Sequence, residues 1–521
     1  GRTSPLAGDA LGVRGVVTHL DVRGVYLEEP GSDDSDATSD ALYVDDAALA
    51  ATARPGETWA VEGTVAELGN GGWTLTSLTA VTGSRRCGRA SLPQTAVRLP
   101  LDITARESLE AMRLAPRGHL VLSEVHGQLD REVTVSADDL RYQPTEIAEP
   151  GELARRFRAS ERDRSLVLHL PGPPDPAIGA GTRLEGVAGV LSDGPQGYRL
   201  LLAEPPEGVV GGPPAPPPPP PRHALRVVSL NLHNYFNGDG RGGGFPTERG
   251  AQSHAEFLDQ QSRLVATVRA LDPHVLAVQE LENDGFGRHS AVQALADALL
   301  ADTGKPWRVA RPEQERAGDD VIAVGLLYRD DQLEAIGPAR LVNAGPFLEL
   351  GRQPLAQRLA DRHGDGEWWV VVNHFKSKGS CPESGRDADR DDGQGCWNAA
   401  RTRAADALMG WVQNLPRERH VRGVLLAGDF NAYRREDPVR RLVRGGYRDA
   451  VLRRRGEPLY TFLWRGEAGS LDYLFADREL AEDVLEAGAW HVNAGWPLRP
   501  DGSPDWLSAS DHDPVYVDLE R

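Results

Sequence analysis

The stretch GVLLAGDFNA, residues 423–432, is an apolar run followed directly by acidic and amide side chains. A run of this length and composition is typical of a strand buried in a sheet. Asp429 and Asn431 stand where that strand ends. The stretch SASDHDPVYVDL, residues 508–519, has the reverse order, because its acidic and histidine residues come just before the apolar run. Together the two stretches predict polar side chains at the rim of a sheet.

Other polar residues have the same relation to an apolar run. They follow or open the runs RVVSLN, HVLAVQE, WWVVVNHF and LDYLFA, and they are Asn231, Glu280, His374 and Asp472. Ligands gather in the crevice at strand termini, so these side chains can converge on one rim. A single acidic residue after a strand is usually a solvated loop residue. The joint occurrence favours a shared site.

The residue types at this rim indicate the chemistry. Hard oxygen ligands are offered by Glu280, Asp429, Asn431 and Asp511. Such ligands suit Mg²⁺, Mn²⁺ or Ca²⁺, whereas the sequence has no Cys/His cluster for zinc. A divalent ion neutralises non-bridging phosphate oxygens and lowers the pKa of a bound water, as phosphodiester cleavage requires. His512 and His374 can carry protons near neutral pH.

The chain changes character near its middle. Residues 205–222 contain a proline run that adopts an extended conformation and acts as a semi-rigid linker. Residues 223–521 alternate apolar runs with helical segments, which predicts a layered α/β domain. Residues 1–86 and 87–204 show short strands at regular spacing and predict two small β-barrel or sandwich modules.

Two helices of the α/β region can be placed from their residues. Ser253 and Glu256 form a capping box that begins one helix, and Pro273 ends it. The run NAARTRAADALMGWV, residues 398–412, is the second.

Composition excludes several classes of protein. A chain of 521 residues is too long for one hydrophobic core. No stretch approaches the roughly 18 apolar residues of a membrane span. The formal net charge of −19 argues against a protein that holds DNA by a global positive field, although an enzyme that must release a polyanion tolerates it.

Cys381 and Cys396 are two of only three cysteines. A bridge between them would close a loop of about 15 residues, a constraint of roughly 3 kcal/mol. That interpretation favours an oxidising compartment. The alternative is two free thiols in a cytosolic protein.

The cationic residues near the motifs are candidates for binding substrate phosphates. Lys376 and Lys378 are two of the three lysines in the chain, and both lie in NHFKSKG. Arg401 is a further candidate, with a structural ion pair as the alternative. Nine arginines between Arg434 and Arg455 form either a strip that tracks phosphates or a solvated helical face.

The run DADRDDGQG, residues 387–395, invites comparison with a calcium-binding loop. Its glycine falls one place too late for an EF-hand, and no glutamate closes it. The run therefore predicts a solvated loop tied by the disulfide, with bound Ca²⁺ as the alternative.

Six motifs, in this order, resemble those of the endonuclease/exonuclease/phosphatase superfamily, to which pancreatic-type deoxyribonucleases and apurinic endonucleases belong: SLNLHNYF, VLAVQELEN, VVVNHFKSKG, LLAGDFNA, SLDYLFA and SASDHDPVYVDL. GDFNA and SDHDPV are the most specific. The resemblance covers residues 223–521 and implies a four-layer α/β (α+β) sandwich of two sheets. The longer context is similar to large secreted bacterial nucleases, whose N-terminal modules resemble OB-type barrels.

The resemblance also implies roles for single residues. Asn231 and Glu280 would belong to the metal and phosphate site. Asp429 would orient or activate the attacking water, and Asn431 would hold the phosphate or a second ion. Asp511 would ligate metal.

The histidines have implied roles as well. His512 would contact the scissile phosphate, and Asp472 would accept a hydrogen bond from it and fix its tautomer. His374 would protonate the leaving 3′-oxygen. Many relatives carry an acid where this chain has His233, which puts a full second metal site in doubt.

We therefore expect a secreted, extracellular enzyme, periplasmic or cell-surface associated as alternatives, that hydrolyses DNA or RNA with little sequence preference. We expect a monomer that uses Mg²⁺ or Mn²⁺, with Ca²⁺ in a structural or activating role. A second hypothesis is a phosphoesterase on lipid or small phosphodiester or monoester substrates, because the same core serves those chemistries. A third is a binding protein with a dead core, against which the complete set of polar residues counts.

Overall fold

The computed structural model describes residues 3–31, 37–69, 74–126, 131–175, 178–194, 197–350, 352–456, 459–496 and 504–521. The chain divides into two compact units. The first consists of Gly1–Arg141 with Ala159–Gly212, and the second of Tyr142–Arg158 with Pro213–Arg521. The short segment Tyr142–Arg158 therefore belongs with the C-terminal part of the chain, which departs from the predicted boundaries.

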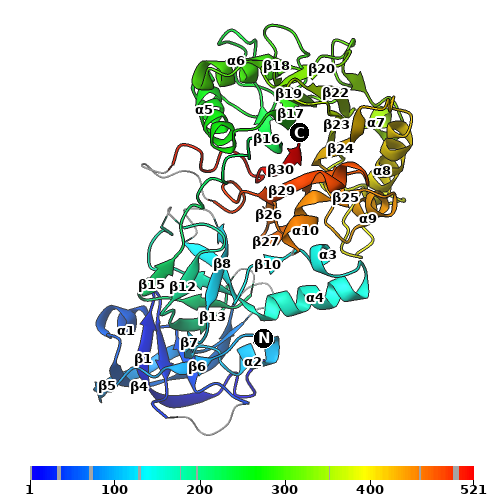
Figure 1. Ribbon diagram of the computed structural model, residues 1–521. Coiled ribbons are helices and arrows are strands. Elements are labelled where there is room, and N and C mark those ends of the chain that lie inside the picture. The colour runs from blue at the N-terminus through cyan, green and yellow to red at the C-terminus, as the bar shows by residue number, and fades with distance from the viewer. Residues whose placement is uncertain are drawn as a thin grey trace. The chain divides into compact units, whose positions relative to one another are not determined.

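Five strands of the first unit close into a barrel in the order β1-β2-β3-β5-β4 (Figure 1). Their bounds are β1 Ala10–Leu20, β2 Val25–Glu28, β3 Ala41–Val44, β4 Glu57–Leu68 and β5 Leu75–Arg89. Alternating apolar side chains such as Val17, Val61 and Leu78 fill its interior, beside the short helix α1 (Ala47–Thr52). The predicted N-terminal barrel is present, and its likeness to OB-type barrels stays a prediction.

The rest of the first unit is built on one nine-stranded sheet rather than a second closed barrel. In spatial order its strands are β15 Gly208–Val210, β12 Arg183–Glu185, β8 Leu120–His126, β9 Glu132–Ala137, β11 Ser165–His169, β14 Arg199–Leu201, β13 Gly189–Ser192, β7 Arg113–Pro116 and β6 Thr95–Val97. Strand β15 lies inside the predicted linker. Tyr26 Oη, from the barrel, contacts Ser192 Oγ at 2.7 Å, so the two predicted modules pack as one unit.

The second unit is a sandwich of two sheets. The first has the order β18 Trp307–Val309, β19 Ile322–Arg329, β17 Val275–Glu282, β16 Ala224–Tyr235, β30 Val515–Glu520 and β29 Val484–Ala489. The second has the order β20 Leu333–Ala335, β22 Leu355–Asp361, β23 Glu367–His374, β24 Val421–Asp429, β28 Asp472–Ala476 and β25 Arg448–Asp449, with β21 Arg340–Leu341 beside β22. Apolar side chains from both sheets, such as Leu326, Val372 and Val517, share one buried core.

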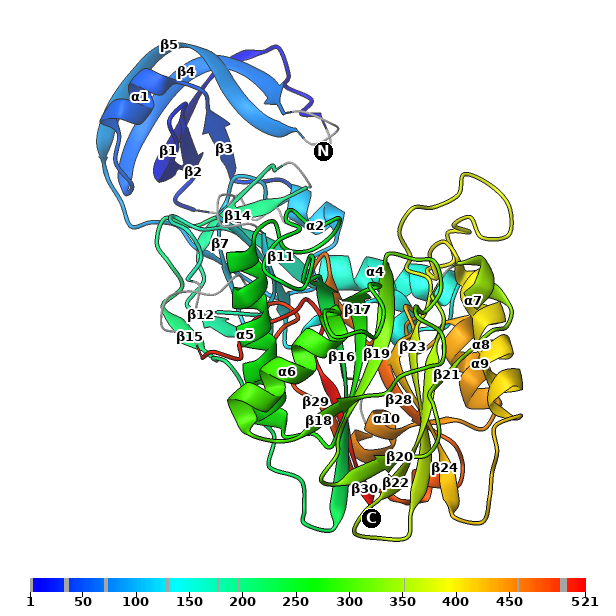
Figure 2. The same ribbon diagram turned by 90° about the horizontal axis from the view of Figure 1, so that it is seen from above.

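Helices cover the outer faces of both sheets, which completes the predicted four-layer architecture (Figure 2). Helices α5 (His254–Leu271) and α6 (Ala291–Thr303) cover one sheet, and α8 (Asn398–Val412) and α9 (Asp437–Arg444) cover the other. The first begins where predicted, because Ser253 Oγ accepts from the Glu256 amide at 3.2 Å. In the described part of the chain, no helix is both long enough and apolar enough to cross a bilayer.

Shorter elements complete the second unit. They are α3 Pro144–Ile147, α7 Pro346–Glu349, α10 Ala450–Arg455 and the hairpin strands β26 Phe462–Trp464 and β27 Glu467–Gly469. Two further helices are α2 (Ile103–Glu107), in the first unit, and α4 (Glu152–Asp163), whose residues up to Arg158 belong to the second unit.

Strand pairing explains why distant motifs meet. His374 pairs with Asp429 at the parallel ends of β23 and β24. Asp429 also pairs with Asp472, the first residue of the antiparallel strand β28. Three residues that are far apart in sequence are therefore cross-strand neighbours at one edge of one sheet.

Candidate active site

The ends of strands from both sheets meet at one rim. Asn231, on β16, donates from Nδ2 to Glu280 Oε1 and to Asp429 Oδ2, at 3.3 Å in both cases. Glu280 lies on β17 and Asp429 closes β24, so one amide joins carboxylates of two sheets. The Asn234 amide donates to Glu280 Oε2 at 3.0 Å. The structure thus brings together three residues that the sequence placed at strand ends.

The backbone at this rim is held in left-handed conformations at non-glycine residues. These have φ of 55° at His233, 55° at Asn234, 60° at Glu280 and 49° at Asn431. Each such residue costs roughly 1 kcal/mol or more and persists only where its surroundings fix it. The amide and Nδ2 of Asn431 donate to the two carboxylate oxygens of Asp429, at 2.8 and 3.1 Å. Strain of this kind is typical of functional sites.

Asp472 and His512 form a buried pair. Asp472 Oδ2 lies 2.8 Å from His512 Nδ1, and Asn493 Nδ2 donates to the His512 carbonyl at 2.7 Å. Burial alone would lower the pKa of His512, but the carboxylates of Asp472, Asp511 and Asp429 outweigh it and hold that pKa well above its ordinary value. These carboxylates therefore favour the imidazolium form of His512.

His233 pairs with Asp511. Its Nδ1 lies 2.7 Å from Asp511 Oδ1. This hydrogen bond raises the pKa of His233 against the effect of burial. Burial raises the pKa of Asp511, but His512 and His233 outweigh it and bring that pKa to about 2. In this structure the carboxylate predicted to bind metal is thus engaged by an imidazolium.

His374 is deeply buried beside the same carboxylates. Its Nε2 lies 3.5 Å from Asp429 Oδ2, 4.0 Å from Glu280 Oε1 and 3.1 Å from Arg352 Nη1. Burial, with Arg352 as the next cause, lowers the pKa of His374 well below its ordinary value. A neutral imidazole that accepts a hydrogen bond from a guanidinium has no proton to give from that nitrogen. The predicted role of His374 as the acid for the leaving group stays a prediction.

The donor set at this rim fits a divalent cation. Ligand atoms of Asp429, Asp472 and His512 lie within 4.8 Å of one another. Burial raises the pKa of Asp429 to about 7, and Asp472 and Glu280 add to the rise while His512 opposes it. Crowded carboxylates of this kind are stabilised in the ionised form by a nearby cation. Since Asp472 is committed to His512, the carboxylate oxygens of Glu280 and Asp429 are the ones that fit. Asn231 turns Nδ2 toward them, and its Oδ1 accepts from the His233 amide at 3.0 Å.

A cavity of about 680 Å³ opens onto these residues. Its lining includes Glu280, His374, Asp429, Asn431, Asp511 and His512. Lys378 also lines it, but Nζ of Lys378 lies 2.7 and 2.5 Å from the carboxylate oxygens of buried Glu436. Lys376 lies with Nζ 5.0 Å from the centre of the Trp397 ring and is not among the residues that line the cavity. The substrate-binding role predicted for these two lysines is not supported.

Arg401 is also misassigned by the sequence. Its side chain is fully buried and donates to the carbonyls of Lys376, Gln394 and Cys396 at 3.0–3.2 Å. A side chain with no exposed surface cannot contact a substrate phosphate. Arg401 instead ties together the loops that flank the cavity, which corrects the substrate-binding prediction and favours the structural alternative.

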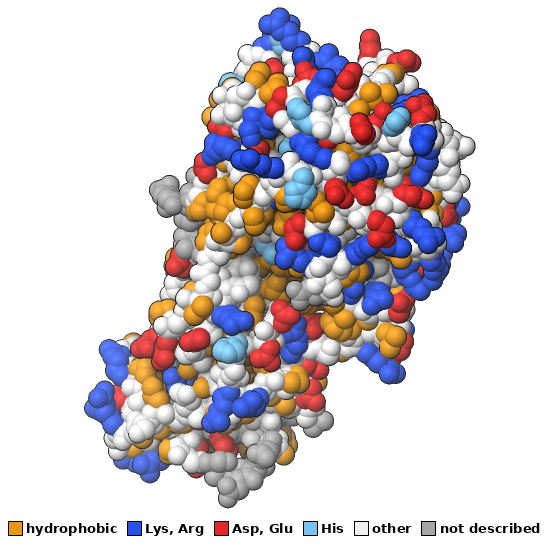
Figure 3. Space-filling view, viewed as in Figure 1, with side chains coloured by type: hydrophobic (Ala, Val, Ile, Leu, Met, Phe, Trp, Pro, Cys, Tyr) orange, Lys and Arg blue, Asp and Glu red, His pale blue; other side chains and the backbone are white. Residues whose placement is uncertain are grey.

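The arginine-rich stretch is largely neutralised. Seven of its nine members form ion pairs: Arg434 with Glu146, Arg435 and Arg440 with Glu149, Arg441 with Asp406, Arg448 and Arg453 with Glu482, and Arg455 with Glu486. Figure 3 shows basic and acidic side chains intermingled on the visible face. This supports the interpretation of a solvated surface over that of a strip that tracks phosphates.

A disulfide joins Cys381 to Cys396, as one of the two alternatives predicted. The acidic loop between them is held by its own hydrogen bonds. Asp387 Oδ1 accepts from the Ala400 amide at 2.7 Å, and Asp392 Oδ1 accepts from the Gln394 amide at 3.0 Å. Within the described residues, no metal-binding cluster was found in this loop. The bridge instead fixes the wall of the cavity that contains Lys378.

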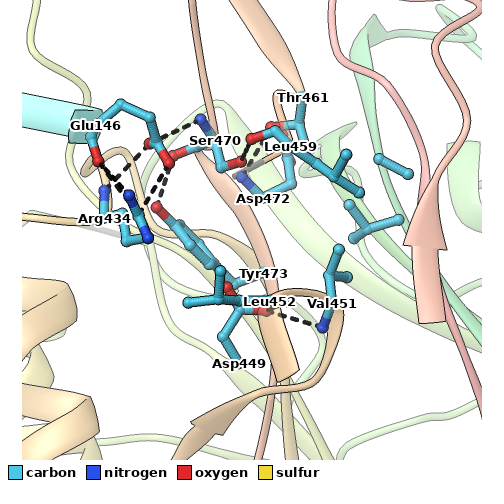
Figure 4. A pocket seen from close by; sticks show the side chains of 12 residues that line it. Glu146, Arg434, Asp449, Val451, Leu452, Leu459, Thr461, Ser470, Asp472 and Tyr473 are labelled. Atoms are coloured by element: carbon cyan, nitrogen blue, oxygen red, sulfur yellow. Dashed lines mark hydrogen bonds and ion pairs between the residues drawn. The ribbon is translucent and has the colours of Figure 1, made fainter. Parts of the chain in front are cut away.

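A second, small cavity of about 20 Å³ is lined by Asp472, the partner of His512, together with polar and apolar side chains (Figure 4). Glu146 points into this region, where Oε2 accepts from the amides of Arg434 and Ser470 at 3.3 and 3.2 Å. Asp472 and Asp449 also line the cavity. Burial raises the pKa of Glu146 to about 7, although Arg434 and these amides oppose the rise.

We expect Glu146→Gln to change how stability depends on pH. Because the folded-state pKa of Glu146 is raised, its contribution to stability is complete below its unfolded pKa and is lost as pH rises through about 7. The loss amounts to roughly 3 kcal/mol. The variant should therefore gain stability relative to the parent at about pH 8 and not at about pH 5, measured by urea unfolding. Glu149→Gln, a partly exposed neighbour, is the control. A difference of equal size at both pH values would contradict the prediction.

Two sheets thus bring carboxylate, amide and imidazole side chains to one rim. The model of the endonuclease/exonuclease/phosphatase family matches residues 237–512, more than half of the chain, and the protein belongs to that family. Members of this family typically hydrolyse phosphoester bonds. No curated protein matches the sequence.

Several solved structures are similar to this chain, each over 57% of its length. An endonuclease/exonuclease/phosphatase from Bacteroides vulgatus is 17% identical, is covered over 98% of its own chain and has a TM-score of 0.38. The catalytic domain of human nocturnin with bound sulfate is 17% identical, with 95% covered and a TM-score of 0.36. Danio rerio TDP2 complexed with a single-strand DNA product is 14% identical, with 99% covered and a TM-score of 0.35.

Sequence reasoning missed several residues of the cavity. Arg158, Arg249 and Arg352 line it, as do the aromatic side chains of Phe462 and Trp464. Arg352 lies between Asp320 and His374. Its Nε donates to Asp320 Oδ2 at 2.8 Å, and its Nη1 lies 3.1 Å from His374 Nε2. None of these residues stands at the end of an apolar run, and the sequence carries no other signal for them.

Proposed function

We propose that this protein is a metal-dependent nuclease that hydrolyses phosphodiester bonds of DNA, or of RNA, with little sequence preference. The observation that carries the proposal is the meeting of the Asp472–His512 pair with the linked carboxylates of Glu280 and Asp429. An imidazolium beside hard oxygen ligands is what a phosphodiester in its transition state requires, because negative charge develops on its oxygens.

Each side chain then has a task that its contacts allow. His512 presents Nε2 to the scissile phosphate, while Asp472 holds its Nδ1 proton and its orientation. Asp429, fixed by Asn431, accepts a proton from the attacking water. Glu280 and Asp429 would hold a divalent ion, and Asn231 would keep the two carboxylates in place. When bound, that ion would neutralise phosphate oxygens and lower the pKa of a bound water.

The disulfide supports a location outside the cytosol. The Cys381–Cys396 disulfide forms and persists in oxidising compartments and is rare in cytosolic proteins. We therefore propose that the enzyme works as a monomer in an extracellular or periplasmic setting.

One observation favours a second candidate, a phosphoesterase on lipid or other partly apolar phosphodiesters. Trp464, on the hairpin β26–β27, is 55% exposed, and its ring stacks near that of Phe462 at 6.4 Å. The Phe462 ring lies 4.6 Å from that of His512. An exposed aromatic side chain this close to the site would suit an apolar group as well as a nucleobase.

Metal removal tests the proposed function. We expect the purified protein to relax and linearise supercoiled plasmid with Mg²⁺ or Mn²⁺, and to lose at least about 100-fold in rate after EDTA treatment. Adding the ion back should restore the rate. Sphingomyelin vesicles and a nucleotide monoester are assayed in parallel. Intact plasmid with Mg²⁺, Mn²⁺ and Ca²⁺, combined with hydrolysis of the vesicles or the monoester, would favour the second candidate.

A further inference from the structure

The segment Tyr142–Arg158 lies well before the family-matched region, which begins at residue 237. It nevertheless belongs to the same compact unit as residues 213–521. It consists of α3 and the first turns of α4. A segment that packs against the catalytic unit can contribute side chains to its site.

Buried contacts fix this segment at two motif loops. Thr145 Oγ1 donates to Glu436 Oε1 at 2.8 Å, and the Thr145 carbonyl accepts from the Arg435 amide at 2.8 Å. Glu146 accepts from the Ser470 amide, two residues before Asp472. The segment therefore bridges the loop that follows Asp429 and the turn that leads into β28.

Two more contacts orient the start of α4. The Gly151 amide donates to the Asp392 carbonyl at 2.7 Å, and Arg155 Nη1 donates to the Asp391 carbonyl at 2.9 Å. Both acceptors lie in the loop closed by the disulfide. Because the helix is held at this end, the direction in which its next turn points is fixed.

That turn carries Arg158 to the catalytic cavity. Arg158 lines the same 680 Å³ cavity as Glu280, His374 and Asp429, and it is exposed. In the described part of the chain no carboxylate lies within ion-pair distance of it. Its neighbours on the helix are engaged, since Arg155 and Arg156 both pair with Glu152.

Two of the other cationic side chains that line the cavity already have acidic partners. Lys378 is held by Glu436, and Arg352 by Asp320. Arg158 and Arg249 are the ones whose side chains have no acidic partner among the described residues. The positive charge available to a polyanion in the cavity therefore lies at Arg158 and Arg249.

We propose that Arg158 binds a backbone phosphate of a polynucleotide, next to the scissile one, so that Tyr142–Arg158 extends the substrate-binding surface of the catalytic unit. This inference rests on the proposed nuclease function. The ligand is a chain with several phosphates. A simple diester whose one phosphate lies at His512 has no second phosphate for Arg158 to bind.

The test compares Arg158→Ala with Arg156→Ala, a matched control on the same helix whose side chain does not line the cavity. We expect Arg158→Ala to raise KM for a single-stranded oligonucleotide by about 10-fold with little change in kcat. The slope of log(kcat/KM) against log[salt] should become shallower by about 0.7. The loss on bis(p-nitrophenyl) phosphate, which has one phosphate, should be much smaller. Arg158→Lys should recover part of the affinity, and Arg156→Ala should behave as the parent.

Equal losses on both substrates, or an unchanged salt slope, would overturn the role of Arg158. If the parent protein hydrolyses neither substrate, the proposed function fails by itself. Fluorescence anisotropy with a labelled oligonucleotide and Mg²⁺ then still decides the inference. A Kd for Arg158→Ala equal to that of the parent would overturn it, and weaker binding with a shallower salt slope would support it.

Discussion

His512→Ala is expected to lower kcat/KM for plasmid DNA by about 10³-fold, because it removes the one buried imidazolium that faces the cavity in the described residues. Because the buried carboxylate of Asp472 loses its partner, some loss of stability is expected, and activity is compared under conditions in which the variant is folded. Rates are measured by plasmid nicking, and the fold by circular dichroism.

Asp472→Asn keeps a side chain of the same shape beside His512 but removes the negative charge of the carboxylate. Loss of the carboxylate removes the main cause that raises the pKa of His512, so that pKa falls. If the protonated form acts, the alkaline limb of the pH–rate profile should move to lower pH. A lower rate with an unshifted profile would contradict this account of His512.

His491→Asn provides a matched control. His491 also pairs with a buried aspartate, Asp513, at 2.9 Å, but it does not line the catalytic cavity. We expect it to retain most of the activity. A loss comparable to that of His512→Ala would mean that damage to any histidine–aspartate pair here disables the protein, and the assignment of His512 would lose its support.

Arg401→Met is expected to destabilise the protein by about 3–5 kcal/mol and not to raise KM selectively. The guanidinium satisfies three buried carbonyl groups and lies 4.0 Å from buried Glu436. A methionine of similar length removes the donor of the Lys376 and Cys396 carbonyls, while the Gln394 carbonyl keeps Lys378 Nζ at 2.7 Å. Urea unfolding measures the loss, and kinetics below the unfolding transition measure KM.

Arg403→Met is a control from the same helix, because Arg403 is partly exposed and forms only a 3.7 Å ion pair with Asp387. Its expected effect is below about 1 kcal/mol. If Arg401→Met instead kept full stability and raised KM for DNA, the original interpretation of Arg401 as a phosphate-binding residue would be restored.

Patterns in the sequence predicted the residues that strand ends position. Asp429, Glu280 and Asn231 follow apolar runs. Fixed register places Asn231 and Glu280 on neighbouring strands of one sheet and Asp429 beside His374 and Asp472 in the other, and the packing of the two sheets brings the two groups together. The layers of the second unit were predictable for the same reason, since apolar periodicity reports which face is buried.

Side chains that act through long-range packing could not be predicted in this way. Lys378 and Arg401 have the residue type of phosphate ligands, but Glu436 and nearby carbonyls engage them. Arg158 has no motif, and it reaches the cavity only because α3 and α4 pack far from their sequence neighbours. Charge and proximity in sequence cannot distinguish a cation that is already neutralised from one that is free for a ligand.

The proline run at residues 213–221 suggests a natural place to excise an autonomous hydrolase, and the path of Tyr142–Arg158 argues against it. A recombinant fragment that began after the prolines would lack the residues that satisfy the Ser470 amide and pair with Arg434. The structural unit is therefore longer than the family-matched region, which begins at residue 237, because it includes a segment that ends 79 residues earlier.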